Sequence, residues 1–148
     1  MTAKEYIEKR LNDLKTTDTT APIFESDEKL IEFIFKTIMS KKFRKFSVNQ
    51  ELIAHIKESI KLNIQNKQPS NFVFPHGAYK LWRLEESPYP DWAELFTSMY
   101  YTKWLKPICE VYEPGVLFEY FVDDLILPTM NNISTTEVES YLNEYQKI

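Results

Sequence analysis

Two short apolar runs decide the fold of this chain, Phe72-Val-Phe74 and Val116-Leu-Phe-Glu-Tyr-Phe-Val122. β-Branched and aromatic side chains favour extended backbone, so both runs predict strands. Between them, residues 91–112 carry apolar side chains at helical spacing and predict a long helix, which Pro107 should kink or split. A strand, a helix and a second strand in this order predict a β-α-β unit with parallel strands.

Residues 1–68, ahead of the first predicted strand, have the pattern of helices. Apolar side chains recur at helical spacing in residues 3–15 and again after Ser26, which can cap a second helix. Ser47 and Gln50 have the spacing of a capping box, which predicts the start of a third helix.

The β-α-β part occupies residues 69–148 and includes a closing helix. Ser134 and Glu137 have capping-box spacing and predict where this helix begins. Residues 125–127 offer a third short strand. We therefore predict a single α/β domain over residues 1–148, with N-terminal helices followed by a small Rossmann-like sheet.

So few strands leave a sheet with open edges and an uncovered face. We expect an incomplete domain that buries this surface in a homo-oligomer or against a missing partner segment.

Composition excludes several classes of function. A net charge of −4 argues against general affinity for nucleic acid, and no stretch approaches the ~18 apolar residues of a membrane span. The charged N-terminus lacks an apolar secretory core, so we expect a cytoplasmic protein without a membrane partner. The single cysteine, Cys109, forms no internal disulfide and lies in an apolar helical pattern, so we expect it to be buried.

The counts of histidine and glycine limit the cofactors. Two histidines and one cysteine, without metal-ligand spacing, predict no metal site. Two glycines, Gly77 and Gly115, exclude the glycine-rich cradles of dinucleotides and nucleoside triphosphates. We therefore predict no cofactor, and any anion site must use side-chain cations and helix N-termini.

Three side chains after the first strand could form such a site: His76, Lys80 and Arg83. Two cations close in sequence can hold a phosphate or a carboxylate, and arginine can do so with two parallel hydrogen bonds. His76 sits where the strand ends in a turn and can donate to an anion or transfer a proton. The alternative is that Lys80 and Arg83 are surface residues and that His76 is an ordinary loop histidine.

Carboxylates occur in two pairs. Asp91 and Glu94 have the spacing of a helix cap, which explains Asp91 and leaves the role of Glu94 open. Asp123 and Asp124 end the second strand, where adjacent side chains point to opposite faces. At most one of these two aspartates can therefore face a given pocket.

Several short motifs occur in a fixed order over about half of the chain, from residue 64 to residue 141. They are Phe74-Pro75, Lys80, Pro90-Asp91 with Glu94, Tyr112 with Pro114-Gly115, Val122-Asp123-Asp124, and Tyr141. This ordered set resembles the front half of the isonitrile (isocyanide) synthase family, which is linked to pyoverdine, paerucumarin and dityrosine biosynthesis.

The resemblance implies a Rossmann-like fold and an enzyme that condenses the amine of an aromatic amino acid with ribulose 5-phosphate, leaving an isonitrile. It implies catalytic roles for Lys80, near phosphate or substrate carboxylate, and for Asp123, at the strand-end pocket. His76, Arg83, Glu94 and Asp124 are the candidate substrate-binding residues, and a phosphosugar or an amino acid is the expected partner. Whether the chain is active alone stays open.

A second class of function stays open beside the enzyme. High aromatic content is typical of protein interfaces, and the chain has no complete catalytic motif. The alternative function is a small acidic cytosolic interaction protein, of the immunity or adaptor type, without catalysis.

Overall fold

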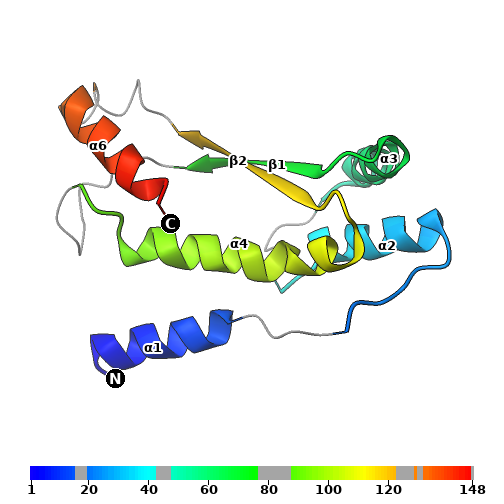
Figure 1. Ribbon diagram of the computed structural model, residues 1–148, viewed down its shortest axis with the longest axis horizontal. Coiled ribbons are helices and arrows are strands. Elements are labelled where there is room, and N and C mark those ends of the chain that lie inside the picture. The colour runs from blue at the N-terminus through cyan, green and yellow to red at the C-terminus, as the bar shows by residue number, and fades with distance from the viewer. Residues whose placement is uncertain (16–19, 43–47, 77–87, 123–128, 130–131, 148) are drawn as a thin grey trace. The chain divides into compact units, whose positions relative to one another are not determined.

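The computed structural model describes residues 1–15, 20–42, 48–76, 88–122, 129 and 132–147 (Figure 1). The described residues form five helices and a two-stranded parallel sheet, which confirms the mixed α/β class. In chain order the elements are α1 (Ala3–Leu14), α2 (Asp27–Ile38), α3 (Gln50–Asn66), β1 (Ser70–His76), α4 (Trp92–Val111), β2 (Val116–Val122) and α6 (Thr135–Tyr145). The β-α-β unit is present, and β2 has the predicted bounds. The third strand predicted at residues 125–127 lies outside the described residues.

Side-chain caps place most of the helix starts where the sequence predicts them. The Ser26 hydroxyl accepts a hydrogen bond from the backbone amide of Lys29, and the Ser134 hydroxyl accepts one from Glu137. Each cap satisfies a backbone donor that the first helical turn leaves without a partner.

The predicted capping box at Ser47 and Gln50 is wrong. Gln50 is the first residue of α3, and the side chain of Asn49 caps the helix by accepting a hydrogen bond from the Leu52 amide at 2.7 Å. The physical reason is that asparagine caps a helix as well as serine does. The helix therefore starts after Asn49, the capping residue that is nearer in sequence to the apolar residues of α3.

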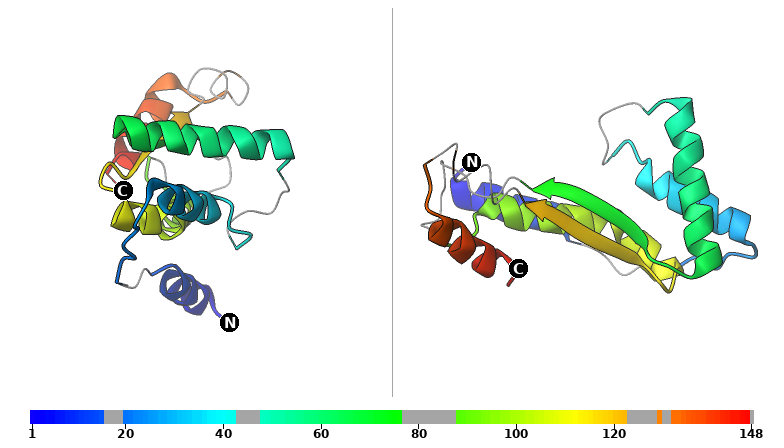
Figure 2. Two further views of the ribbon diagram at one scale, coloured as in Figure 1. Left: turned by 90° about the vertical axis from the view of Figure 1, so that its right-hand side faces the viewer. Right: turned by 90° about the horizontal axis from the view of Figure 1, so that it is seen from above.

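The chain divides into two compact units, and α4, β1 and β2 each contribute a segment to both. Unit 2 comprises residues 16–72 and 101–117, and in it α3 runs across α2 (Figure 2). Its buried side chains are mainly aliphatic. They are Ile34, Ile60, Leu105, Ile108 and Tyr112, together with the polar Ser70.

Hydrogen bonds between residues far apart in the sequence join the helices of unit 2. The indole nitrogen of Trp104 donates to the Thr37 carbonyl at 2.8 Å. The Tyr112 hydroxyl lies 2.8 Å from the Asn63 carbonyl and 2.6 Å from the Gln68 carbonyl. The Asn63 carbonyl also accepts backbone hydrogen bonds from Lys67 and Gln68, so the hydroxyl adds a side-chain link between Tyr112 and the C-terminal end of α3.

The second half of α4 bears on two expectations. Pro107 lies inside a helix that continues to Val111, so it does not split the helix, and the kink stays a prediction. Cys109 is exposed and not buried as expected, although it lies one turn after the buried Leu105 on the same helix. The predicted turn ahead of β2 is confirmed: Gly115 has a φ of 67°, a left-handed conformation that glycine adopts without steric cost.

Unit 1 comprises residues 1–15, 73–100 and 118–148. Phe118 and Tyr120 are two residues apart on β2, so they share one face of the sheet, and Phe74 of β1 stacks against Phe118 at 5.4 Å between ring centroids. The buried residues of unit 1 are Asp91, Glu94, Val138 and Tyr141. Two of them are carboxylates and one is a phenol.

In the part of the chain that the structure describes, no helix has both the length and the apolar character that a membrane crossing requires.

Candidate functional site

Most of the predicted site residues fall outside the described residues. Lys80, Arg83, Asp123 and Asp124 lie in segments 77–87 and 123–128, and their proposed roles stay predictions. His76 is the last residue of β1, and its side chain is also outside the described part. Glu94 is the one predicted site residue whose surroundings can be examined.

Glu94 is a buried carboxylate in the first turn of α4, with 2% of its surface exposed. Its Oε2 atom accepts a hydrogen bond from the backbone amide of Asp91 at 2.8 Å. Burying a carboxylate is costly unless hydrogen bonds replace the lost water, and the N-terminus of a helix favours negative charge. These two effects allow Glu94 to be buried here.

Asp91 supports the start of the same helix. Its Oδ1 atom accepts a hydrogen bond from the Trp92 amide at 2.8 Å, and its carbonyl accepts one from the Glu94 amide at 3.0 Å. Asp91 is 8% exposed. The bond from the Asp91 amide to the Glu94 carboxylate is one half of a capping box, whereas the Asp91 carboxylate accepts from the amide of the next residue, Trp92. The role of Asp91 as an N-cap stays a prediction.

The phenol of Tyr145, on α6, lies within electrostatic range of Glu94. Burial raises the pKa of Tyr145 above its ordinary value, a hydrogen bond with Ser98 lowers it, and Tyr120 and the negative charge of Glu94 raise it further. The structure therefore brings together four side chains from α4, β2 and α6. We call Glu94, Ser98, Tyr120 and Tyr145 the carboxylate–tyrosine cluster.

Four aromatic rings pack against one another within and around this cluster, and we call Phe118, Tyr120, Tyr141 and Tyr145 the aromatic wall. Tyr120 meets Tyr145 edge to face at 5.9 Å between centroids, and Tyr141 stacks on Tyr145 at 6.1 Å. Phe118 stacks on Tyr120 at 6.4 Å. The hydroxyl oxygens of Tyr141 and Tyr145 are both buried. The phenols therefore present polar groups within an otherwise apolar aromatic surface.

The chemistry available to the cluster is hydrogen bonding and proton transfer. A carboxylate accepts hydrogen bonds from an ammonium group and can act as a general base, while phenols donate and accept. Within the described ranges, no group of three or more histidine, cysteine, aspartate or glutamate residues could hold a metal ion. The cluster suits the binding of an amine next to an aromatic or apolar group.

Sequence reasoning identified Glu94 but missed Ser98, Tyr120 and Tyr145. The available signal was the helical spacing. Glu94 and Ser98 are four residues apart on α4, and Tyr141 and Tyr145 are four apart on α6, so each pair shares a helix face. The sequence does not show that these two faces meet.

Comparisons with known proteins assign no family. A scan against protein-family models, a search of curated proteins and a search of solved structures found no match to this chain. The interpretation of function therefore rests on the chemistry of the carboxylate–tyrosine cluster and on the ordered motifs of the sequence.

Proposed function

We propose that this chain binds an aromatic amino acid at the carboxylate–tyrosine cluster, as the front half of an isonitrile synthase-like enzyme with a Rossmann-like fold. The reaction would condense the substrate amine with ribulose 5-phosphate. The observation that carries the proposal is the burial of the Glu94 carboxylate in the first turn of α4, the helix that follows β1 and precedes β2 in the chain, within electrostatic range of the Tyr145 phenol.

The chemistry of the amine supports a carboxylate at this place. An α-amino group is protonated at neutral pH, so a buried carboxylate favours its binding through a charge-assisted hydrogen bond. Condensation with a ketone needs the neutral amine, and a carboxylate that accepts the proton provides it. The aromatic wall offers contact to the ring of the substrate.

The remaining roles follow the motif resemblance. Lys80 and Arg83 would hold the phosphate of the sugar or the carboxylate of the amino acid. Asp123 would act at the end of β2, with His76 and Asp124 contacting substrate. Any one pocket takes at most one of the two adjacent aspartates, because neighbouring strand residues point to opposite faces.

Binding of L-tyrosine to the purified chain, measured by isothermal titration calorimetry, tests the proposal. Glu94→Gln should weaken binding about tenfold or more, because a hydrogen bond to a charged group contributes about 1.5–3 kcal/mol. Glu139→Gln changes an exposed carboxylate on α6 and should leave binding unchanged. Equal affinities of the wild type and Glu94→Gln would contradict the assignment of the site.

Activity requires a separate measurement. The chain would be incubated with L-tyrosine and ribulose 5-phosphate, and the isonitrile product sought by mass spectrometry. A product that Glu94→Gln abolishes supports the enzyme. Binding without any product, from a chain with intact substrate affinity, would limit the function to amino-acid binding.

One observation favours the interaction-protein alternative. Parallel strands are ordinarily covered on both faces, yet Val73 of β1 is 61% exposed and Leu117 of β2 is 46% exposed. In this alternative, a partner protein covers these side chains. Sedimentation velocity separates the two functions: a monomer at high micromolar concentration favours the interaction protein, and self-association that Val73→Lys abolishes favours an incomplete domain that buries this surface against its own copy.

A further inference from the structure

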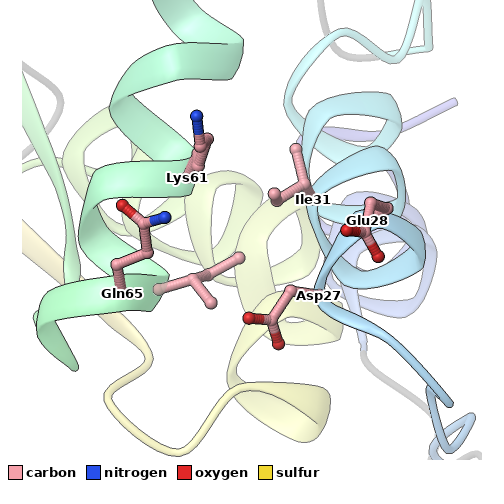
Figure 3. Close-up of a pocket in the computed structure, with 6 residues that line it drawn as sticks. Asp27, Glu28, Ile31, Lys61 and Gln65 are labelled. Atoms are coloured by element: carbon pink, nitrogen blue, oxygen red, sulfur yellow. The ribbon is translucent and has the colours of Figure 1, made fainter.

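A pocket of about 160 Å³ lies between α2 and α3, entirely within unit 2 (Figure 3). The first turns of α2 and the last turns of α3 line it. The lining residues are Asp27, Glu28, Ile31, Lys61, Ile64 and Gln65. The volume is close to the ~150 Å³ of an apolar cavity that accepts benzene, so a ligand of about six non-hydrogen atoms fits.

Contacts outside the pocket hold its two walls in place. Lys57 of α3 forms an ion pair with Glu32 of α2 at 2.8 Å, and the same ammonium lies 4.5 Å from the centre of the Phe35 ring. At the C-terminal end of α3, the Tyr112 hydroxyl contacts the Asn63 and Gln68 carbonyls. The pocket is therefore part of a packed helix pair, and its walls need little rearrangement to receive a ligand.

The charges that line the pocket favour a cation. Two carboxylates and one ammonium leave one negative charge in excess. The ammonium of Lys61 is already 3.7 Å from Glu58 on its own helix, and in Figure 3 it points away from Asp27. A hydrogen bond from Ser26 lowers the pKa of Glu28, so Glu28 remains ionised at neutral pH.

The helix dipoles do not change this balance. The pocket lies near the N-terminus of α2, which carries a partial positive charge, and near the C-terminus of α3, which carries a partial negative charge. The two partial charges oppose each other. The excess negative charge of the side chains therefore decides the sign of the preferred ligand.

The polar and apolar parts of the lining are separate. The Asp27 carboxylate and the Gln65 amide extend into the space between the helices (Figure 3). Ile31 and Ile64, one from each helix, supply half-buried apolar surface. A ligand with one charged end and one short apolar end matches this arrangement.

We propose that the pocket between α2 and α3 binds a small aliphatic primary amine, with the ammonium at the Asp27 carboxylate and the carbon chain against Ile31 and Ile64. Gln65 accepts a hydrogen bond from the ammonium through its amide oxygen. Glu28 adds a second negative charge nearby. The site is independent of the proposed enzyme function, because it shares no residue with the carboxylate–tyrosine cluster.

The test is a titration of the full-length, ¹⁵N-labelled chain with isopentylamine, followed by the backbone amide resonances. A ligand of six non-hydrogen atoms should bind with a millimolar Kd, so the titration extends to on the order of 50 mM. We expect saturable shifts in residues 27–31 and 61–65. Absence of saturable shifts in these segments would overturn the proposal.

Two isosteric probes test the role of charge. Isopentanol has the same carbon chain without the charge, and 3-methylbutanoate carries a negative charge. Isopentylamine should bind about fivefold or more tightly than isopentanol, and 3-methylbutanoate should bind more weakly than both. Equal binding of the amine and the alcohol would overturn the proposal, and so would preferential binding of the anion.

A pair of variants tests the position of the ammonium. Asp27→Asn should weaken isopentylamine binding about fivefold while leaving isopentanol binding unchanged. Glu51→Gln is the matched control, since Glu51 is also an exposed carboxylate in the first turn of a helix but does not line the pocket. If both variants weaken the amine equally, general electrostatics accounts for the effect and the site assignment is wrong. A ¹⁵N spectrum of each free variant verifies its fold.

Discussion

The two units bury different kinds of side chain. In unit 2 the buried residues Ile34, Leu105 and Ile108 are aliphatic and at most 1% exposed. In unit 1, a glutamate and a tyrosine are buried to a similar degree, Glu94 at 2% and Tyr141 at 1%. Aliphatic burial is the main source of stability, whereas a buried carboxylate stabilises little and needs dedicated partners. The difference teaches that unit 2 mainly contributes an apolar core, whereas unit 1 buries side chains that can form hydrogen bonds or transfer protons.

The largest expected effect is the loss of packing in unit 2. Leu105→Ala removes a buried side chain and leaves a cavity, so unfolding free energy should fall by about 2–5 kcal/mol. Chemical denaturation measures the change. Leu52→Ala, at a position 49% exposed, is the control and should have a much smaller effect. Equal losses for both variants would show that Leu105 is not a core residue.

The next effect concerns the buried carboxylate of unit 1. Glu94→Ala leaves the Asp91 amide without its acceptor, which should cost about 1–3 kcal/mol of unfolding free energy. Glu94→Gln retains an acceptor oxygen and should cost less. The comparison of the two variants by denaturation separates the hydrogen bond from the charge. A Glu94→Gln variant as unstable as Glu94→Ala would indicate that the charge itself stabilises the fold.

A smaller effect is expected at Asp91. If Asp91 is an N-cap, Asp91→Ala should cost about 0.5–2 kcal/mol and Asp91→Asn should be nearly neutral; both variants remove or replace the acceptor of the Trp92 amide at the start of α4. Thermal unfolding and L-tyrosine binding should both be measured. If Asp91→Asn keeps its melting temperature but loses binding, the aspartate has a role beyond capping.

The smallest effect at neutral pH comes from two tyrosines: Tyr145 in unit 1, which is half-buried, and Tyr112 in unit 2, which is buried. Burial raises the pKa of Tyr145 in unit 1 and of Tyr112 in unit 2 above the ordinary value of 10.0. A raised pKa in the folded state contributes stability that is fully present below about pH 10 and is lost as pH rises through the folded-state pKa. The unfolding free energy should therefore fall between about pH 8 and pH 11, and it should fall less in Tyr145→Phe and in Tyr112→Phe than in the wild type. Chemical denaturation at the two pH values measures the difference.

The two tyrosines differ in their charged surroundings, and this difference sharpens the comparison. Glu94 raises the pKa of Tyr145, whereas burial alone raises that of Tyr112. Glu94→Gln should thus lower the pKa of Tyr145 and leave that of Tyr112 unchanged, as followed by NMR of ¹³C-labelled tyrosine rings. An unchanged Tyr145 would show that Glu94 does not act on it in solution.

Local sequence signals predicted most of the elements. The apolar run from Val116 to Val122 gave a strand with the observed bounds, and the caps at Ser26 and Ser134 marked two helix starts. These predictions succeed because strand preference and capping depend on residues within a few positions of one another. The prediction that Ser47 caps the third helix is wrong, although it used the same capping preferences. Asn49 is an equally good cap and lies closer to the apolar residues of the helix.

The candidate site was only partly predictable. Glu94 was found because its spacing from Asp91 is local, although its burial was not foreseen. The exposure of Cys109 was missed, because an apolar helical pattern does not reveal which positions its neighbours cover. Ser98, Tyr120 and Tyr145 were missed because residues up to about fifty positions apart form the cluster.

The sequence by itself determined the mixed α/β class, the order of strand, helix and strand, and the glycine turn ahead of β2, because each depends on short-range backbone preferences. Only the tertiary structure decided that Glu94 is buried within electrostatic range of the Tyr145 phenol. It alone also decided that α2 and α3 line a pocket with excess negative charge. Burial and charge balance depend on which helix faces meet, and packing among distant residues determines that meeting.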